Sequence, residues 1–323
     1  MKIKKTPSLS FKNFSAGNDA IDLSGSPLSE GRDRDWVFTE THDQLILSAF
    51  YALGVPHDTN IFCTIALPYG WADSVGPALC RRITGRHNLH GGSREYAWNL
   101  KAVYKKQGSL ALLSHAYMPG VGIDHAVLES GVVIDPGSYT TEIIPFIKGK
   151  ANNKAHSAKD LGMKLVADKV QAWLLKERNI IVDTPEAMRI IHERSLTRKG
   201  RQVEGVSQQI DLYLKMLAAR VYERGKNTLD IDSCNLIFMT GGTGAAIVEC
   251  FKQLEPRVVT SKTPILDNAK GAAVNSLRAP SGWEAVGLDV GSGYVKAVWM
   301  GEATTRAVIF PSVIGDALTG GAL

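Results

Sequence analysis

The sequence lacks the patterns that mark several protein classes. Its four cysteines, Cys63, Cys80, Cys234 and Cys250, form no CxxC pair and have no metal-ligand spacing, which favours free thiols over a zinc site or a disulfide framework. No apolar run approaches the roughly 18–20 residues that cross a bilayer, so we expect no membrane segment. No apolar stretch of a signal peptide follows the basic first residues. We therefore expect a cytoplasmic protein.

A strong excess of one charge is also missing. The 323 residues include 37 Lys and Arg against 32 Asp and Glu, a net charge of +5. No basic block is long or interleaved with aromatic residues, so the sequence has no direct nucleic-acid signature. With 44% hydrophobic residues, the composition is that of a globular protein, and the chain is long enough for two domains with separate cores.

Apolar periodicity predicts helices that alternate with strands. Helices are predicted over 41–54, 71–86, 157–178, 185–194, 206–224, 241–254 and 268–277, and strands over 60–68, 110–114, 236–240, 258–259 and 307–314, with two strands in each of 131–146 and 285–300. This alternation indicates the α/β class. The two strand–turn–strand segments add antiparallel pairs, so we expect mixed sheets.

Two of these segments resemble each other, GVVIDPGSYTTEII (131–144) and VGLDVGSGYVKAVW (286–299). In each, an apolar strand ends in Asp, x-Gly-Ser follows, and a polar turn leads to a second strand. Gly137, Gly291 and Gly293 allow a tight turn whose N–H groups point toward one spot, a concavity that suits a phosphate. Two near-copies make an ordinary glycine hairpin a poor explanation.

The side chains of these turns fit the same chemistry. Asp135 and Asp289 end their strands, where each could reach a hydrated Mg²⁺ or an attacking water; they are the predicted catalytic residues and, through water, the predicted metal residues. Lys296 on a second strand could reach a phosphate as a point charge. The predicted nucleotide-binding residues of the two turns are Gly137, Ser138, Tyr139, Thr140, Gly291, Ser292, Gly293, Tyr294 and Lys296.

A third motif is LIFMTGGTGAAIV (236–248), where a strand runs into Gly241, Gly242, Thr243 and Gly244 at the start of a helix. Glycine backbone can approach a nucleotide closely, and a helix N-terminus favours negative charge. Short-chain dehydrogenases open with a similar pattern to bind NAD. A dinucleotide fold needs most of its sheet after this motif, whereas only about eighty residues follow here, without a Tyr-x-x-x-Lys.

Together the three motifs resemble the superfamily of actin, heat-shock chaperones and sugar kinases, and within it the ParM-type actin-like proteins that segregate plasmids. GLDVGSGYVK (287–296) is similar to their phosphate-1 hairpin, and residues 134–142 are similar to phosphate 2. Residues 241–245 resemble the adenosine motif, and Phe-Pro-Ser at 310–312 often follows phosphate 1 in that family. The resemblance covers residues 36–323.

The resemblance implies an actin-like, ribonuclease H-like fold of two lobes. Residues 1–130 would form most of lobe I, 131–250 mainly lobe II, 251–280 a return to lobe I, and 281–323 the phosphate-1 hairpin and third strand of lobe I. It also implies a nucleoside triphosphatase that takes ATP or GTP with Mg²⁺. Self-association into filaments and a DNA-binding adaptor protein would be its partners in plasmid segregation.

The chain departs from the family in the order of its motifs. The family order is phosphate 1, phosphate 2, adenosine, whereas here phosphate 1 comes last. Circular permutation is the simplest explanation, with the linker around 278–284 joining the original ends and the new ends lying in a loop after the third strand. Exposed loops tolerate such cuts.

A second departure concerns hydrolysis. The family usually places Glu or Gln before a GVG-type turn to position the hydrolytic water, and here Pro119, or His115 in another alignment, holds that place. Proline cannot act as a base or orient water, which argues against fast hydrolysis. Two other functions therefore stay open: a small-molecule kinase on the same fold, with Asp135 as its catalytic residue, and a scaffold that binds nucleotide with little turnover.

Overall fold

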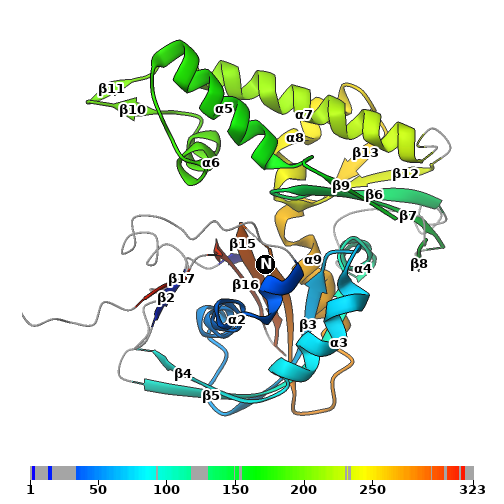
Figure 1. The fold of residues 1–323 in the computed structure, drawn as a ribbon. Coiled ribbons are helices and arrows are strands. Elements are labelled where there is room, and N and C mark those ends of the chain that lie inside the picture. The colour runs from blue at the N-terminus through cyan, green and yellow to red at the C-terminus, as the bar shows by residue number, and fades with distance from the viewer. Residues whose placement is uncertain are drawn as a thin grey trace, which may run out of the picture. The chain divides into compact units, whose positions relative to one another are not determined.

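The computed structural model describes residues 2–3, 14–16, 34–91, 94–117, 130–148, 150–152, 155–229, 231, 234–291, 293–301, 304–312 and 314–316. The chain forms two compact units (Figure 1). Unit 1 comprises Met1–Gly120 and Leu266–Leu323, and unit 2 comprises Val121–Ile265. The sequence had placed the divisions after residues 130 and 250. The second division lies later because β13 (Val258–Thr260) pairs with β12 (Leu236–Met239) and so belongs to the sheet of unit 2.

Unit 1 is built on a seven-stranded sheet in the order β1-β16-β15-β14-β3-β5-β4. The strands are β1 (Lys2–Ile3), β3 (Thr59–Leu67), β4 (Gly85–Gly91), β5 (Arg94–Lys106), β14 (Glu284–Val290), β15 (Tyr294–Met300) and β16 (Thr305–Pro311). Strands β14, β15 and β16 form an antiparallel meander, while β14 is parallel to β3 and β3 to β5. The predicted mixed sheet is therefore confirmed.

The two faces of this sheet carry different helices. Along β3 and β14, alternate side chains such as Cys63, Ile65 and Leu288 join the core formed with α2 (Glu40–Leu53) and α3 (Ala72–Ile83), which follow the short helix η1 (Arg34–Phe38). Residues in the other phase face α4 (Ser109–Tyr117) and α9 (Asp267–Ser276). Because side chains alternate between the faces of a strand, Asp289 lies on the face of α4 and α9.

The prediction of a strand at 110–114 was wrong, since these residues lie in helix α4. A short apolar run suits a buried strand and a buried helix equally well, and periodicity does not separate them. Here the run is a helix because it packs against α9 at a close approach that a glycine permits: a Cβ at Gly271 would lie 1.8 Å from the carbonyl oxygen of Leu110. The β4–β5 hairpin was not predicted.

Unit 2 repeats part of this topology. Its sheet has the order β13-β12-β6-β7-β8, with β9 also paired to β7. The remaining strands are β6 (Ser130–Pro136), β7 (Thr140–Ile147), β8 (Lys150–Ala151) and β9 (His156–Lys159). In unit 2, β6, β7 and β9 are antiparallel neighbours, and β12 and β13 lie in parallel on the other side of β6. In unit 1, β14, β15 and β16 are likewise antiparallel neighbours, with β3 and β5 in parallel on the other side of β14. The two matching hairpins thus occupy equivalent places in their sheets.

The core of unit 2 lies between this sheet and four helices, α5 (Met163–Arg178), α6 (Thr184–Glu193), α7 (Val206–Thr228) and α8 (Gly241–Lys252). The helix predicted from 157 begins only at 163, because 156–159 pair with β7 as β9. None of the helices in the described ranges is both long and apolar enough to span a membrane. All four cysteines are free.

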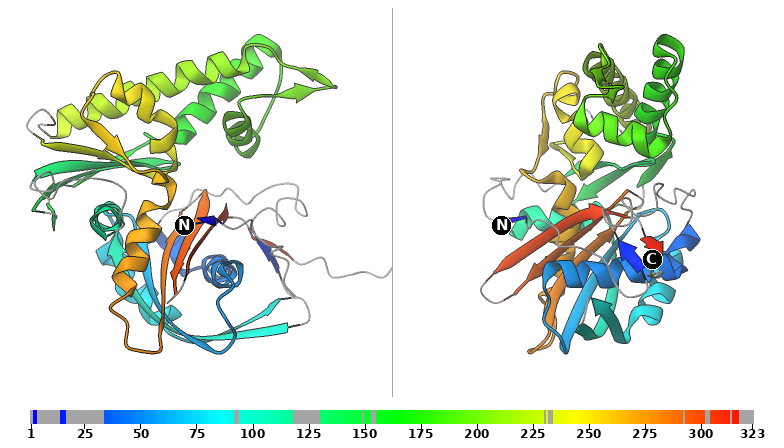
Figure 2. Two further views of the ribbon diagram at one scale, coloured as in Figure 1. Left: turned by 180° about the vertical axis from the view of Figure 1, so that it is seen from behind. Right: turned by 90° about the vertical axis from the view of Figure 1, so that its left-hand side faces the viewer.

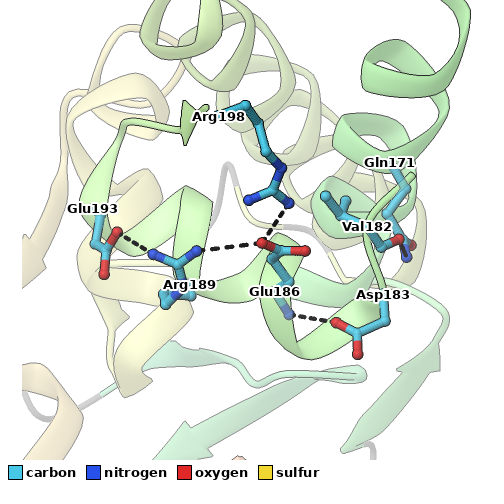
Figure 3. A network of polar contacts seen from close by, with 7 residues as sticks. All are labelled: Gln171, Val182, Asp183, Glu186, Arg189, Glu193 and Arg198. Carbon is cyan, nitrogen blue, oxygen red and sulfur yellow. Dashed lines mark hydrogen bonds and ion pairs between the residues drawn. The ribbon is translucent and has the colours of Figure 1, made fainter. Parts of the chain in front are cut away.

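A basic stretch at the end of α6 forms a small hairpin of β10 (Thr197–Arg198) and β11 (Arg201–Gln202). Figure 3 shows how it is fastened: the guanidinium of Arg198 donates to Oε1 of Glu186 at 2.6 Å, and Arg189 donates to the same oxygen at 3.4 Å. Asp183 caps the first turn of α6 by accepting from the amide of Glu186 at 2.8 Å. The hairpin is therefore anchored to α6.

The first and last described segments of the chain lie together in unit 1. β1 pairs in parallel with β16, and β2 (Phe14–Ala16) pairs with β17 (Ile314–Asp316), so 2–3 and 14–16 are neighbours of described residues near the other end of the chain (Figure 2). α9 and β14, on either side of the predicted linker, also contact each other.

An ion pair in unit 2 makes stability depend on pH. Arg257 donates to both carboxylate oxygens of Glu255 at 2.8 Å, and this contact lowers the pKa of Glu255 from its ordinary value of 4.5. The ion pair contributes fully to the stability of the folded protein above pH 4.5, and this contribution is lost as the pH falls through the lower pKa of Glu255 in the folded state. Since Arg257 is partly exposed, we expect only about 1 kcal/mol from the pair.

We expect acid to destabilise the parent protein more than the Glu255→Gln variant. The measurement is the free energy of unfolding in urea between pH 6 and pH 3. Glu249→Gln is the matched control, because Glu249 is 78% exposed in its contact with Lys252. Parallel pH profiles of the parent and Glu255→Gln would contradict the assignment.

Candidate functional site

The two matching hairpins close with the same turn. The amide of Gly137 donates to the carbonyl of Thr140 at 2.7 Å, and the amide of Gly291 donates to the carbonyl of Tyr294 at 3.1 Å. In both hairpins the aspartate precedes the glycine by two residues and lies in a buried strand end: Asp135 is 8% exposed and Asp289 is 4% exposed. The resemblance seen in the sequence is therefore a resemblance of backbone geometry.

In unit 1, Asp289 is held by two donors. Nζ of Lys296, its cross-strand partner, lies 3.1 Å from Oδ2, and Nε2 of Gln107 donates to Oδ1 at 2.8 Å. The ammonium also lies at the turn, since a Cβ on Gly291 would be 3.0 Å from it. A carboxylate and an ammonium are thus placed together at the β14–β15 turn.

The serine of the Phe-Pro-Ser segment fastens this turn. Ser312, 1% exposed, donates its hydroxyl to the carbonyl of Gly291 at 2.7 Å and its amide to the carbonyl of Gly293 at 3.0 Å. The Phe-Pro-Ser segment therefore stabilises the turn of the hairpin that precedes it. Ser292 lies outside the described residues.

In unit 2, two carbonyls of the β6–β7 turn accept hydrogen bonds from residues of α5 and α8. Gly137 accepts from the hydroxyl of Thr243 at 2.8 Å and from the amide of Met163 at 3.1 Å, and Ser138 accepts from the amide of Lys164 at 2.8 Å. Within the described part of the chain, the amides of Ser138 and Tyr139 donate to no protein acceptor. These amides are suited to an anion.

The glycine-rich motif meets the same turn. Gly241 has φ +79°, in the left-handed region, and a Cβ on it would lie 2.4 Å from Oδ1 of Asp135 and 3.0 Å from the carbonyl oxygen of Pro136. Only glycine fits both constraints. The structure thus brings the second and third sequence motifs together within one unit.

Helix α8 begins at this contact without a side-chain cap. Its N-cap residue, Thr240, donates its hydroxyl to the carbonyl of Pro264 at 3.2 Å instead of accepting from the helix. Gly242 is exposed in the first turn, while Thr243 and Gly244 are buried, with Thr243 bound to Gly137. The first amides of a helix carry partial positive charge, which favours a phosphate.

The structure adds two residues that the sequence analysis did not select. Gln107 follows β5 and contacts Asp289, although it is distant from every motif in sequence. Glu142, 4% exposed, is the cross-strand partner of Asp135, just as Lys296 is of Asp289. A residue-by-residue alignment of the hairpins would have identified Glu142, whereas no sequence signal marks Gln107.

The predicted residues thus fall into two groups. Asp289, Gly291, Gly293, Tyr294 and Lys296 lie at the turn in unit 1, and the residues of the other two motifs meet in unit 2. That Asp135 and Asp289 share one pocket stays a prediction. Pro119 lies outside the described residues. His115 is buried in α4, with Nε2 at 3.6 Å from Oδ2 of Asp267.

The described residues supply few protein ligands for a divalent cation. Among the described residues, no group of three or more His, Cys, Asp and Glu side chains could hold a metal ion. Asp289 already accepts from two side chains, and Asp135 lies opposite another acidic residue, so each carboxylate fits contact with a hydrated cation better than full coordination. This agrees with an ion that arrives bound to phosphates.

Comparisons with known proteins identify the fold. Residues 133–253 match the family model of the C-terminal part of the archaeal actin homologue MreB-like proteins. The archaeal actin homologue Ta0583 in complex with ADP is similar with a TM-score of 0.65 and 20% identity, over 77% of this chain and 81% of that chain. No curated protein matches the sequence.

Two ParM structures are similar to the same degree. The non-polymerisable quadruple mutant of pCBH ParM has a TM-score of 0.64 and 19% identity, over 77% of this chain and 78% of that chain. A subunit of the 15-stranded ParM filament from Clostridium botulinum has a TM-score of 0.61 and 19% identity, over 75% and 74% of the two chains. The chain therefore has the fold of the actin-like ATPases, as the sequence predicted.

Proposed function

We propose that this protein binds ATP or GTP with Mg²⁺, hydrolyses it and forms filaments that serve plasmid or DNA segregation. The observation that carries the proposal is the repeated hairpin in an actin-like fold, with a buried aspartate at the same position before each turn. A triphosphate carries negative charge on each of its three phosphates, and two such turns supply amides and a lysine for them. The ADP complex of Ta0583 supports nucleotide as the ligand.

Each motif has a separate task in this proposal. The β14–β15 turn with Lys296 binds one part of the phosphate chain, and the amides of Ser138 and Tyr139 bind another. Asp289 and Asp135, assisted by Glu142, hold the water shell of Mg²⁺, which neutralises phosphate charge when it is bound. Gly241–Gly244 at the start of α8 lie against the sugar and base side.

Gln107 supplies the water-orienting group that the sequence analysis did not find at Pro119. Its amide nitrogen donates to Asp289 at 2.8 Å, which leaves its carbonyl oxygen to accept from a water beside that carboxylate. Orientation of the attacking water by a glutamine is an established device in nucleotide hydrolysis. We therefore propose that hydrolysis does not depend on position 119.

We further propose that the chain is circularly permuted. The pairing of β1 with β16 and of β2 with β17 places the first and last described segments side by side, as a cut in a loop after the third strand requires. The contact between α9 and β14 supports the short linker that would join the original ends. The ParM filament structure supports self-association. A DNA-binding adaptor protein is the further partner that we propose.

The first test is nucleotide binding by calorimetry with Mg²⁺ present. We expect the Asp289→Asn variant to lose about a hundredfold in affinity, about 2.8 kcal/mol, because Asn keeps the shape but not the charge that holds the hydrated cation. Asp58→Asn is the control, since Asp58 is 66% exposed in its contact with Arg86. Equal affinities for the parent and Asp289→Asn would refute the assigned role.

The second test separates the three functions. Phosphate release with nucleotide-dependent light scattering supports the filament ATPase or GTPase. Turnover that requires an added sugar supports the small-molecule kinase. Tight binding with neither supports the scaffold and contradicts our proposal.

A further inference from the structure

The first turn of α9 carries a buried polar cluster in unit 1. Asp267 is 0% exposed, and its carboxylate lies 3.6 Å from Nε2 of His115 and 3.8 Å from Nζ of Lys270. Burial lowers the pKa of Lys270, and the carboxylate of Asp267 opposes that shift. Moving Lys270 away would remove a compensating charge from the buried carboxylate of Asp267, which is costly. These contacts therefore hold the turn in place where the chain returns to unit 1 at Leu266.

The next residue connects this point to the candidate site. Asn268, 4% exposed, accepts the amide of Gly108 at 2.9 Å through its side-chain oxygen. The backbone amide of Gln107 is also fixed, since it donates to the carbonyl of Leu67 at 2.8 Å. The side chain of Gln107 then donates to Asp289. A continuous path of short contacts thus runs from Asn268 through Gly108 and Gln107 to Asp289.

We infer that Asn268 is a positioning residue. It fixes the Gln107–Gly108 peptide and so holds the side-chain amide of Gln107 on Asp289. The inference rests on the proposed function for its effect on turnover, because Asp289 and Gln107 act there on Mg²⁺ and water. Its structural part is independent of that function.

Two asparagines of α9 provide a matched comparison. Asn275 lies on the same helix and donates to the hydroxyl of Thr64 at 2.9 Å, so it is not part of the path to Asp289. We expect Asn268→Ala and Asn275→Ala to bind nucleotide within about threefold of the parent, while only Asn268→Ala lowers kcat, by about tenfold, because positioning acts on the chemical step. Equal kcat values for the two folded variants would overturn the inference.

A second readout needs no turnover. In nucleotide-free protein labelled with ¹⁵N, the side-chain amide signal of Gln107, identified by its loss in Gln107→Glu, should shift in Asn268→Ala and stay in place in Asn275→Ala. If Asn268→Ala does not fold, Asn268→Asp and Asn268→Ser are compared, since Asp keeps an oxygen for the amide of Gly108 and Ser is too short. An unchanged Gln107 signal refutes the positioning role. A parent protein that binds no nucleotide refutes the proposed function instead.

Discussion

The Gly241→Ala variant is expected to lose about a hundredfold in nucleotide affinity, equivalent to about 2.8 kcal/mol. A methyl group at this position would lie 2.4 Å from Oδ1 of Asp135, so either the carboxylate or the start of α8 must move. Both belong to the proposed site, and a shift of either separates the turn that binds phosphate from the helix that binds the rest of the nucleotide. Calorimetry with Mg²⁺-nucleotide gives the affinity directly.

Backbone strain alone also destabilises such a variant, and unit 2 contains the control for it. Gly200 has φ +74°, nearly the φ of +79° at Gly241, but a Cβ there would meet nothing within 4 Å. Gly200→Ala therefore has the cost of a left-handed alanine, about 1–2 kcal/mol in stability, without a clash. If the two variants bind nucleotide equally well, the clash at Gly241 does not disturb the site and the prediction is wrong.

The Gly271→Ala variant is expected to lose about 3–5 kcal/mol of stability, the largest effect on folding that we predict. The new Cβ would lie 1.8 Å from the carbonyl oxygen of Leu110 and 2.5 Å from its carbonyl carbon. Backbone of α4 cannot rotate away as a side chain can, so α4 and α9 must separate. Because α4 begins just after Gln107 and α9 contains Asn268, turnover should fall as well.

Gly225→Ala separates this effect from helix propensity. Gly225 also lies inside a helix, α7, and its added Cβ would be 2.3 Å from Cδ1 of Ile231, the far end of a flexible side chain. Alanine gains about 1 kcal/mol in propensity over glycine, which offsets the cost of moving Ile231. Urea unfolding of both variants decides the point: a midpoint for Gly271→Ala as high as that for Gly225→Ala would show that the helices tolerate a wider spacing.

The sequence by itself determined the parts of the molecule that depend on local pattern. Alternating strands and helices gave the α/β class, and Asp-x-Gly-Ser after an apolar strand predicted both hairpins, because tight turns need glycine wherever they occur. The end of α2 at Gly54, in the left-handed conformation, followed from the same chemistry. Local signals of this kind do not require knowledge of the rest of the chain.

Only the tertiary structure decided which residues meet across long separations. The apolar segment at 110–114 is helical because α9 approaches it closely at Gly271, which no window of a few residues contains. Gln107 contacts Asp289 although 182 positions separate them, because β5 and β14 both run parallel to β3 and end at the same edge of the sheet. Glu142 is placed opposite Asp135 by strand register, which the turn sets. Side-chain chemistry indicated the candidate residues, and the order of strands in each sheet determined which residues lie next to them.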